Sequence, residues 1–507
     1  MKTVIIFSFL FIVTLLAQAS CIASSGDADN AFLFGKKLSG SGHMQEAITQ
    51  FSKAIKLNPA TASYYAERGW CYAMKGYRKL AFADFTKAIT IDPDCSNAFS
   101  YRGELNAAIG FKKKSQEDCN KALSIGISPI DTMGFLNRGR VYSTLGREKD
   151  AGKDFEQALK VIGSSSGAGT YYQKAICEFC FKHSTEALAD VNNAIKLESL
   201  NPDYIFLRGL IYSSDGKTQE AVSDYTQVLK ITPDNLGAKY NRACNYMTLG
   251  KNDLAIKELN DDIAYEPCPN NLIKRANYFE AKEDYATAVK DTTQAITIDP
   301  DDVKAYITRG YEYCHLKKLK QALKDLNQAL VLDPKSAWAF YQRGVAYSDL
   351  GEMDKAINDL SKAIALQPQA GAFYSRAYTY REKKDYKRAI EDYTSAIRLD
   401  PTALDYCGRG CSYRFEGQYD KAIQDCTKAI ALDSHRTHSY LTRGVSYAKL
   451  KQFDKSLQDL NMAIKQSPRF GEAYYERSLV YKQLGNYKSA EADANEAKKL
   501  HFKSCLH

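Results

Sequence analysis

The sequence predicts an all-α fold made of tandem antiparallel helical hairpins. Three observations indicate this fold. A segment of 33 to 36 residues recurs along the chain, each copy carries a small residue at one fixed place, and a second small residue follows twelve positions later. The chain is 45% apolar and 12% aromatic, with only 12 Pro among its 507 residues, a composition typical of an ordered protein with a long core.

Each copy contains two helix-length stretches that meet at these small residues. Small side chains at matched sites let two antiparallel helices approach closely. The first small position is occupied by Gly35, Gly69, Gly103, Gly139, Ala175, Gly209, Ala243, Ala276, Gly310, Gly344, Ala377, Gly410, Gly444 and Ser478. The second is occupied by Ala47, Ala81, Ser115, Ala151, Ala187, Ala221, Ala255, Ala288, Ala322, Ala356, Ala389, Ala422, Ser456 and Ala490. The sequence therefore predicts fourteen hairpins.

Glycine and proline mark where the helices of a hairpin end. A Leu-Gly step such as Leu350-Gly351 lies between the two small positions, where Gly ends the first helix. An Asp-Pro step such as Asp400-Pro401 ends the second helix, because Pro cannot continue it.

The order of helix, short turn, helix and terminating Pro, repeated every 33 to 36 residues, resembles the tetratricopeptide repeat. The resemblance covers about residues 28–502. The resemblance implies a right-handed superhelical solenoid whose first helices line a concave groove for other proteins or peptide segments. The predicted organisation is a signal peptide at 1–19, a linker at 20–27, repeats 1–4 at 28–163, a Gly/Ser-rich joint at 164–169, repeats 5–14 at 170–502 and a tail at 503–507.

A basic residue and an acidic residue sixteen positions later recur around the small positions. The turn lies near the midpoint, so both side chains fall at the same height on facing helices. The pairs include Arg68 with Asp84, Arg309 with Asp325, Arg343 with Asp359 and Arg443 with Asp459. Repeat 1 loses both members together, as expected of a pair in which one buried charge cannot be left alone. We interpret them as structural salt bridges, with a ligand-binding charge ladder as the alternative.

If the resemblance holds, two positions on each first helix face the groove, three residues before and one residue after the small position. They form an apolar, Tyr-rich stripe, the chemistry of protein-binding surfaces. Aromatic residues at helical spacing are equally typical of a core, and the sequence leaves the choice open. The candidates are Tyr172, Phe206, Tyr240, Ile307, Tyr311, Tyr341, Tyr374 and Tyr378.

The N-terminus resembles an export signal. Lys2 precedes an apolar run from Thr3 to Leu16, and Ala17-Gln18-Ala19 suits signal peptidase. We expect an exported protein, either periplasmic, envelope-associated or secreted. Cys21 offers lipidation as a competing route, and a cytosolic protein with an uncleaved hydrophobic N-terminus is the other alternative.

The sequence offers little for catalysis. Most of the 13 Cys replace small or apolar residues of other repeats and so resemble buried free thiols, which fits poorly with an oxidising compartment. The spacing of Cys177 and Cys180 suits redox or metal chemistry, but no second such motif completes a zinc site. The Gly163–Gly169 stretch lacks the Lys of a phosphate-binding loop.

We therefore expect a non-enzymatic scaffold or adaptor with protein partners and no cofactor or metal. A cytosolic co-chaperone or regulatory subunit is the alternative. The 69 basic and 60 acidic residues are spread without long runs, which argues against nucleic-acid binding. Contact with a membrane is expected only through the signal peptide or a lipid anchor.

Overall fold

The computed structural model describes residues 26–127, 129, 131–163 and 166–500, and this part of the chain is helical without any strand. The predicted signal peptide, Cys21 and the predicted tail lie outside the described residues. The first described helix covers residues 26–40, so residues 26 and 27 of the segment predicted as a linker are helical.

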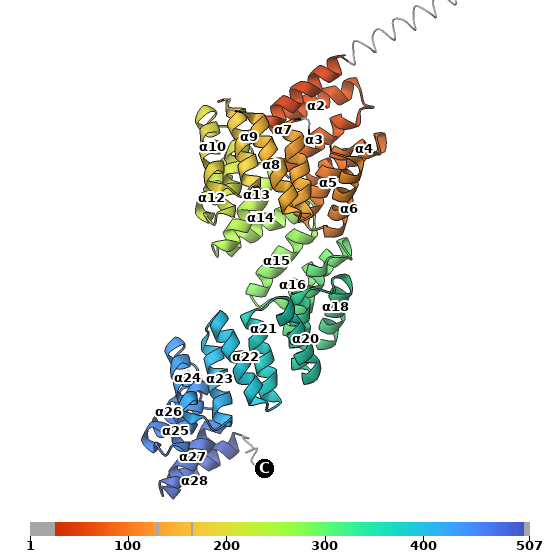
Figure 1. Cartoon of the computed structure of the whole chain (residues 1–507). Coiled ribbons are helices and arrows are strands. Elements are labelled where there is room, and N and C mark those ends of the chain that lie inside the picture. Colours follow the sequence, from red (N-terminus) through yellow and green to blue (C-terminus); the bar gives the residue numbers. More distant parts are fainter. Residues whose placement is uncertain (1–25, 128, 130, 164–165, 501–507) are drawn as a thin grey trace, which may run out of the picture. The chain divides into compact units, whose positions relative to one another are not determined.

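The helices pair into antiparallel hairpins (Figure 1), each with a first and a second helix. Residues 26–40 are the first helix of repeat 1. The first helices of repeats 2–14 are α3 (Ala62–Met74), α5 (Ser96–Ile109), α7 (Thr132–Thr144), α9 (Ala168–Cys180), α11 (Pro202–Ser214), α13 (Leu236–Thr248), α15 (Pro269–Ala281), α17 (Val303–His315), α19 (Ala337–Asp349), α21 (Ala370–Glu382), α23 (Ala403–Phe415), α25 (Thr437–Lys449) and α27 (Gly471–Gln483).

The second helices follow in the same order. They are α2 (Met44–Leu57), α4 (Arg78–Ile91), α6 (Lys112–Ile125), α8 (Glu148–Ile162), α10 (Ser184–Leu197), α12 (Thr218–Ile231), α14 (Asn252–Tyr265), α16 (Tyr285–Ile298), α18 (Leu319–Leu332), α20 (Met353–Leu366), α22 (Tyr386–Leu399), α24 (Tyr419–Leu432), α26 (Phe453–Gln466) and α28 (Tyr487–Lys499). The right-handed superhelical solenoid expected from the repeat is the observed fold class.

The small residues allow the close helix packing that the sequence predicts. A Cβ atom added at Gly69 would lie 2.7 Å from the Phe85 ring, and one added at Gly344 would lie 2.7 Å from Cγ of Leu360. Both neighbours are fully buried on the second helix of the same hairpin. A larger residue at these positions would push the two helices apart.

The chain divides into two compact parts, Met1–Ala305 and Tyr306–His507, which we call the N-terminal block and the C-terminal block. The division falls inside α17 and not at the predicted Gly/Ser-rich joint, of which residues 164 and 165 lie outside the described part. Apolar side chains pack across that joint, since Phe155 of α8 and Cys177 of α9 share one buried cluster. This shared core places both flanks of the joint in one block.

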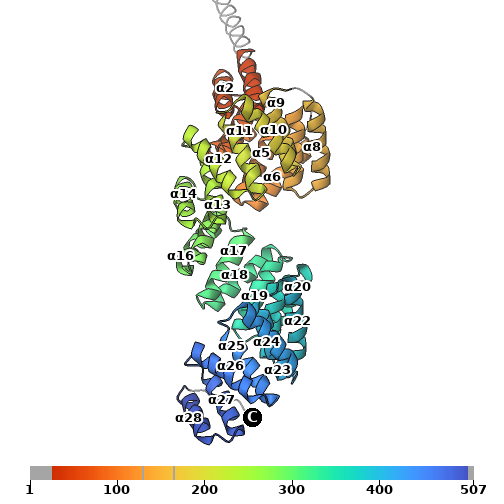
Figure 2. The same ribbon diagram turned by 90° about the vertical axis from the view of Figure 1, so that its left-hand side faces the viewer.

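In the N-terminal block, repeats far apart in sequence lie side by side. Figures 1 and 2 both show the red and orange helices next to the yellow-green ones. Hydrogen bonds join these regions, for example from the Tyr204 hydroxyl to the carbonyl oxygen of Ser41 at 2.7 Å. The block therefore closes on itself.

Among the described residues, no helix has both the length and the apolar character needed to span a bilayer.

Candidate protein-binding face

The predicted charge pairs lie in contact on the facing helices of repeats 2–4 and 6–14. Arg68 donates two hydrogen bonds to the Asp84 carboxylate, each at 2.8 Å. Arg309 with Asp325, Arg343 with Asp359, and Arg443 with Asp459 have the same two-bond geometry, with distances of 2.6 to 3.0 Å. The carboxylates are buried and the guanidinium groups partly buried.

A third contact of these arginines was not expected from the sequence. In many repeats the remaining guanidinium nitrogen donates to a polar side chain on the second helix of the preceding repeat. Arg343 Nη1 donates to Asn327 at 2.7 Å, and Arg443 Nη1 donates to Thr427 at 3.0 Å. The arginine thus joins two neighbouring repeats as well as the two helices of its own hairpin. Its guanidinium charge is paired with a carboxylate inside the fold.

Repeat 5 shows what a lysine does at this position. Burial raises the pKa of Asp190, and the charge of Lys174 offsets this effect only in part. A lysine is a point charge without the planar fork that binds a carboxylate and a third group together. This pair is accordingly the weaker version of the contact.

The groove candidates of the N-terminal block are largely core residues. Tyr172 is 3% exposed in a cluster with Tyr204, and Phe206 is 9% exposed against Tyr225. Tyr240 is partly buried, with Lys274 above its ring. Here the core interpretation holds for Tyr172 and Phe206, because the closed block covers them.

The groove candidates of the C-terminal block are more exposed, with one exception. Ile307 is 6% exposed and belongs to the core. Tyr311 is partly buried and packs on His315, while Tyr341 packs on Trp338 with ring centroids 5.1 Å apart. Tyr374 contacts Tyr393 on α22, and Tyr378 is 40% exposed.

Three exposed side chains beside these candidates were not predicted from the sequence. Trp338 is 47% exposed, Leu404 is 45% exposed and Phe415 is 52% exposed, all on first helices. Trp338 and Leu404 lie six residues before the small position of their repeats, and Phe415 lies five residues after it. The same helical period could have found them, because residues spaced by three, four and seven share one face.

These residues form one face because neighbouring first helices contact each other. α19 packs against α21, and α21 packs against α23. Gly371 of α21 occupies the position that matches Trp338 and Leu404, and a Cβ atom there would lie 3.3 Å from the Tyr341 hydroxyl. We call Trp338, Tyr341, Tyr374, Tyr378, Leu404 and Phe415 the aromatic face.

Two arginines border the aromatic face. Arg381 lies 4.8 Å from the ring centroid of Tyr378, and Arg414 lies 4.5 Å from that of Phe415. Phe415 also stacks on Tyr386 at 4.8 Å. Nearby Tyr393 is among the groups that raise the pKa of Arg381 above its usual value although burial opposes this. Both arginines thus lie beside exposed aromatic rings, an arrangement that is enriched in protein-binding hot spots.

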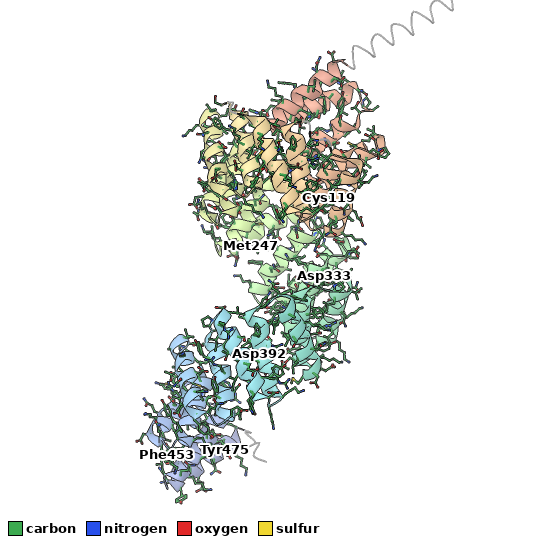
Figure 3. The ribbon with its side chains drawn as sticks, viewed as in Figure 1. Cys119, Met247, Asp333, Asp392, Phe453 and Tyr475 are labelled. Carbon is green, nitrogen blue, oxygen red and sulfur yellow. The ribbon has the colours of Figure 1, made fainter. Side chains whose placement is uncertain are left out.

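The cysteines of the described chain are free thiols. Burial raises the pKa of Cys119, which Figure 3 labels on α6, to about 12, and that of Cys180 to about 11. Burial also raises the pKa of Cys177. A thiol with a raised pKa is a poor nucleophile at neutral pH. Within the described residues, no group of three or more His, Cys, Asp or Glu side chains is placed to hold a metal ion.

Comparisons with known proteins identify the repeat. Tetratricopeptide repeat family models match residues 32–95, 134–164, 202–235, 310–351, 337–369, 370–402, 403–436 and 441–501, which together cover more than half of the chain. These matches lie on both sides of the division between the two blocks.

Curated relatives share only part of the chain. Human tetratricopeptide repeat protein 6 is 26% identical over 175 residues, covering 33% of this chain and 32% of the relative. Human DnaJ homolog subfamily C member 7 is 28% identical over 153 residues, covering 29% of this chain and 27% of the relative. The chain therefore spans about a third of the length of these relatives.

Solved structures resemble the chain at low sequence identity. A tetratricopeptide repeat protein from Parabacteroides merdae is 20% identical, covering 46% of this chain and 94% of its own, with a TM-score of 0.38. Yeast Tom70 is 17% identical, covering 94% of this chain and 99% of its own, with a TM-score of 0.38. On the evidence of the family matches and the fourteen helical hairpins, the chain belongs to the tetratricopeptide repeat family.

Proposed function

We propose that the protein is a non-enzymatic scaffold that binds a segment of another protein on the aromatic face of the C-terminal block. Membership of the tetratricopeptide repeat family supports a role in protein interaction. The placement of that role on the aromatic face rests on one observation. Among the first helices of repeats 2–14, as far as the structure describes them, those that carry an exposed large apolar side chain are α19, α21 and α23. All three belong to the C-terminal block.

The partner segment is expected to be apolar with polar edges. Exposed Trp, Tyr and Phe supply large contact area at low entropic cost, and the bordering arginines supply hydrogen bonds and charge.

The test compares partner capture by matched variants of the full chain. We expect Trp338→Ala and Phe415→Ala each to weaken capture from the native source about tenfold or more, because exposed aromatic anchors carry most of the energy of an interface. Leu366→Ala and Leu432→Ala are the controls, since both residues are similarly exposed but lie on second helices. Equal losses for the two sets, or full capture by the aromatic-face variants, would reject the proposal.

We further propose that the protein acts after export, on the grounds of the N-terminal apolar run and the small residues that follow it. Mass spectrometry of the N-terminus of protein isolated from its source tests this. A chain beginning at Ser20 supports export, and a chain beginning at a lipid-modified Cys21 supports an envelope-anchored form. A chain that retains Met1 in the cytosol contradicts export and favours the cytosolic co-chaperone or regulatory subunit.

A further inference from the structure

Three turns of the N-terminal block are packed against repeats that lie five positions further along the chain. The turn of repeat 1 contacts the start of repeat 6, where Met44 N donates to Asp203 at 3.0 Å. The turn of repeat 2 contacts the start of repeat 7, where Gly237 N donates to the Lys75 carbonyl oxygen at 3.4 Å. The turn of repeat 3 contacts the start of repeat 8, where the Asn270 amide donates to the carbonyl oxygen of Ala108 at 2.8 Å.

The glycines of these turns fit only because they lack a side chain. Gly42, Gly76 and Gly110 have positive φ angles, like the glycines of the other turns. A Cβ atom at Gly42 would lie 2.6 Å from the Tyr204 ring, and one at Gly76 would overlap the backbone nitrogen of Gly237. The matching position of Gly216 has no neighbour within 4 Å.

The contacts are complementary in charge, with bases on the early turns and acids on the later repeats. His43 pairs with Glu198 at 3.0 Å. Lys113 pairs with Asp301 at 2.9 Å. The Tyr77 hydroxyl donates to Asp234.

The second helix of repeat 2 extends the same charge pattern into the interior. Arg78 is buried and lies 3.0 Å from Asp262, which is 1% exposed and 184 residues away in sequence. Arg78 also donates to the carbonyl oxygen of Glu266 at 2.9 Å. Lys79 donates to the carbonyl oxygen of Tyr265 at 2.9 Å. The joined surfaces thus carry several polar contacts, and those exposed to solvent are open to screening by salt. Apolar packing also crosses the junction, since Cys268 of repeat 8 belongs to the buried cluster that contains Trp70 and Ile109.

A residue of a docked repeat helps to cover the first helices of the block. Trp70 is 7% exposed in a buried cluster that includes Cys268 of repeat 8, and Arg140 of repeat 4 lies 4.4 Å from its ring centroid. Arg140 Nε also pairs with Glu104 Oε2 at 3.2 Å, yet Arg140 Nη2 and Glu104 Oε1 have no hydrogen-bond partner in the described structure. Burial raises the pKa of Glu104. Charged groups with unused bonding capacity thus lie on a face that corresponds to the aromatic face of the C-terminal block.

We propose that these turn contacts are an electrostatic clasp that holds the N-terminal block closed and opens to uncover its first-helix face. The clasp consists of the turns of repeats 1–3 with the starts of α4 and α6, docked on the ends of α10, α12, α14 and α16 and the starts of α11, α13 and α15. Because its exposed charge pairs are screened by salt, higher ionic strength weakens the clasp, whereas the apolar contacts alone would be insensitive to salt or strengthened by it.

Hydrogen exchange on the full chain tests the clasp with two sets of variants. In the first set, Gly76→Ala is compared with Gly216→Ala. Both positions have positive φ, +81° and +74°, so the backbone strain of the new residue is matched and only Gly76 loses its docking. We expect exchange in peptides covering residues 75–79 and 234–238 to be about tenfold faster in Gly76→Ala than in Gly216→Ala, because the clasp opens before the block unfolds.

The second set weakens the clasp without touching the core. The triple variant Tyr77→Phe, Lys79→Ala and Lys113→Ala removes three solvent-exposed contacts and leaves each helix intact. We expect about tenfold faster exchange in the same peptides and a further increase in 0.5 M salt. Peptides of α19 to α24 serve as the internal reference and keep their exchange rates.

Opening of the clasp should also make the first-helix face of the N-terminal block accessible to solvent. Peptides containing Trp70 and Arg140 should gain exchange together with the clasp peptides. If the triple variant leaves exchange unchanged, or if it accelerates exchange equally throughout the N-terminal block at all salt concentrations, there is no clasp that opens separately. These outcomes do not depend on partner capture by the C-terminal block, so they are distinct from a failure of the proposed function.

Discussion

At the residue scale, the arginine before the small position explains much of the sequence of each repeat. Its guanidinium group binds the acid of its own hairpin and a polar residue of the preceding repeat. It also lies between two aromatic rings of its own helix, as Arg309 does between Tyr306 and Tyr313 at 5.9 Å from each. These rings account for part of the 35 Tyr. The acids lie on the second helices, such as Asp392 on α22 (Figure 3).

Arg343→Ala should lower the free energy of local unfolding of α19 and α20 by about 3 kcal/mol, because it leaves Asp359 buried without its partner. The double variant Arg343→Ala with Asp359→Asn should lose less, since no charge remains. Native-state hydrogen exchange measures both. Equal losses for the single and double variants would mean that the two residues do not interact.

At the scale of the element, each of the fourteen hairpins turns through one residue with positive φ. Nine of these residues are glycines, and five are Lys182, Glu283, Lys317, Lys384 and Lys451. The turns share the hydrogen bonds of a helix C-cap, such as Glu352 N to the Tyr347 carbonyl oxygen at 2.9 Å. The hairpin geometry is thus retained where the preferred residue is absent.

Lys451→Gly should therefore stabilise the hairpin of α25 and α26. A residue with a Cβ atom is strained in the left-handed region, and Lys451 has φ of 59°. The expected gain is about 1 kcal/mol in local unfolding free energy, measured by hydrogen exchange. Gly351→Ala is the reciprocal control and should cost a similar amount. A loss of stability in Lys451→Gly would show that the lysine side chain contributes more than its backbone strain costs.

At the scale of the whole molecule, thiols are distributed over both blocks, and six of the eleven in the described part of the chain are buried. Burial raises the pKa of Cys268 and of Cys314 to about 11. Such thiols react slowly with alkylating agents at neutral pH, because the thiolate is scarce and hidden. These thiols therefore act as small apolar side chains of the core.

Alkylation of native protein at pH 8 should be about a hundredfold slower at Cys71, Cys119 and Cys177 than in guanidinium chloride. Peptide mapping by mass spectrometry measures the rate at each site. Rapid labelling of Cys177 and Cys180 in native protein would instead indicate a reactive pair, and would revive the redox interpretation of their spacing.

The sequence by itself determined the repeat and most of what lies inside it. The small positions, the turns, and pairs such as Arg343 with Asp359 follow from spacings within one hairpin, where helix geometry fixes which side chains meet. Local periodicity carries this information fourteen times over, which is why the hairpins could be predicted.

Only the tertiary structure decided which copies of the stripe are covered. Tyr172 and Tyr374 occupy the same position of their repeats, three residues before the small residue, but Tyr172 is buried in the closed block and Tyr374 is only partly buried in the other. The closure depends on contacts between residues about 160 apart, such as Tyr204 with Ser41. Small rotations between successive repeats add up to bring those residues together, and no periodic pattern in the sequence encodes that sum.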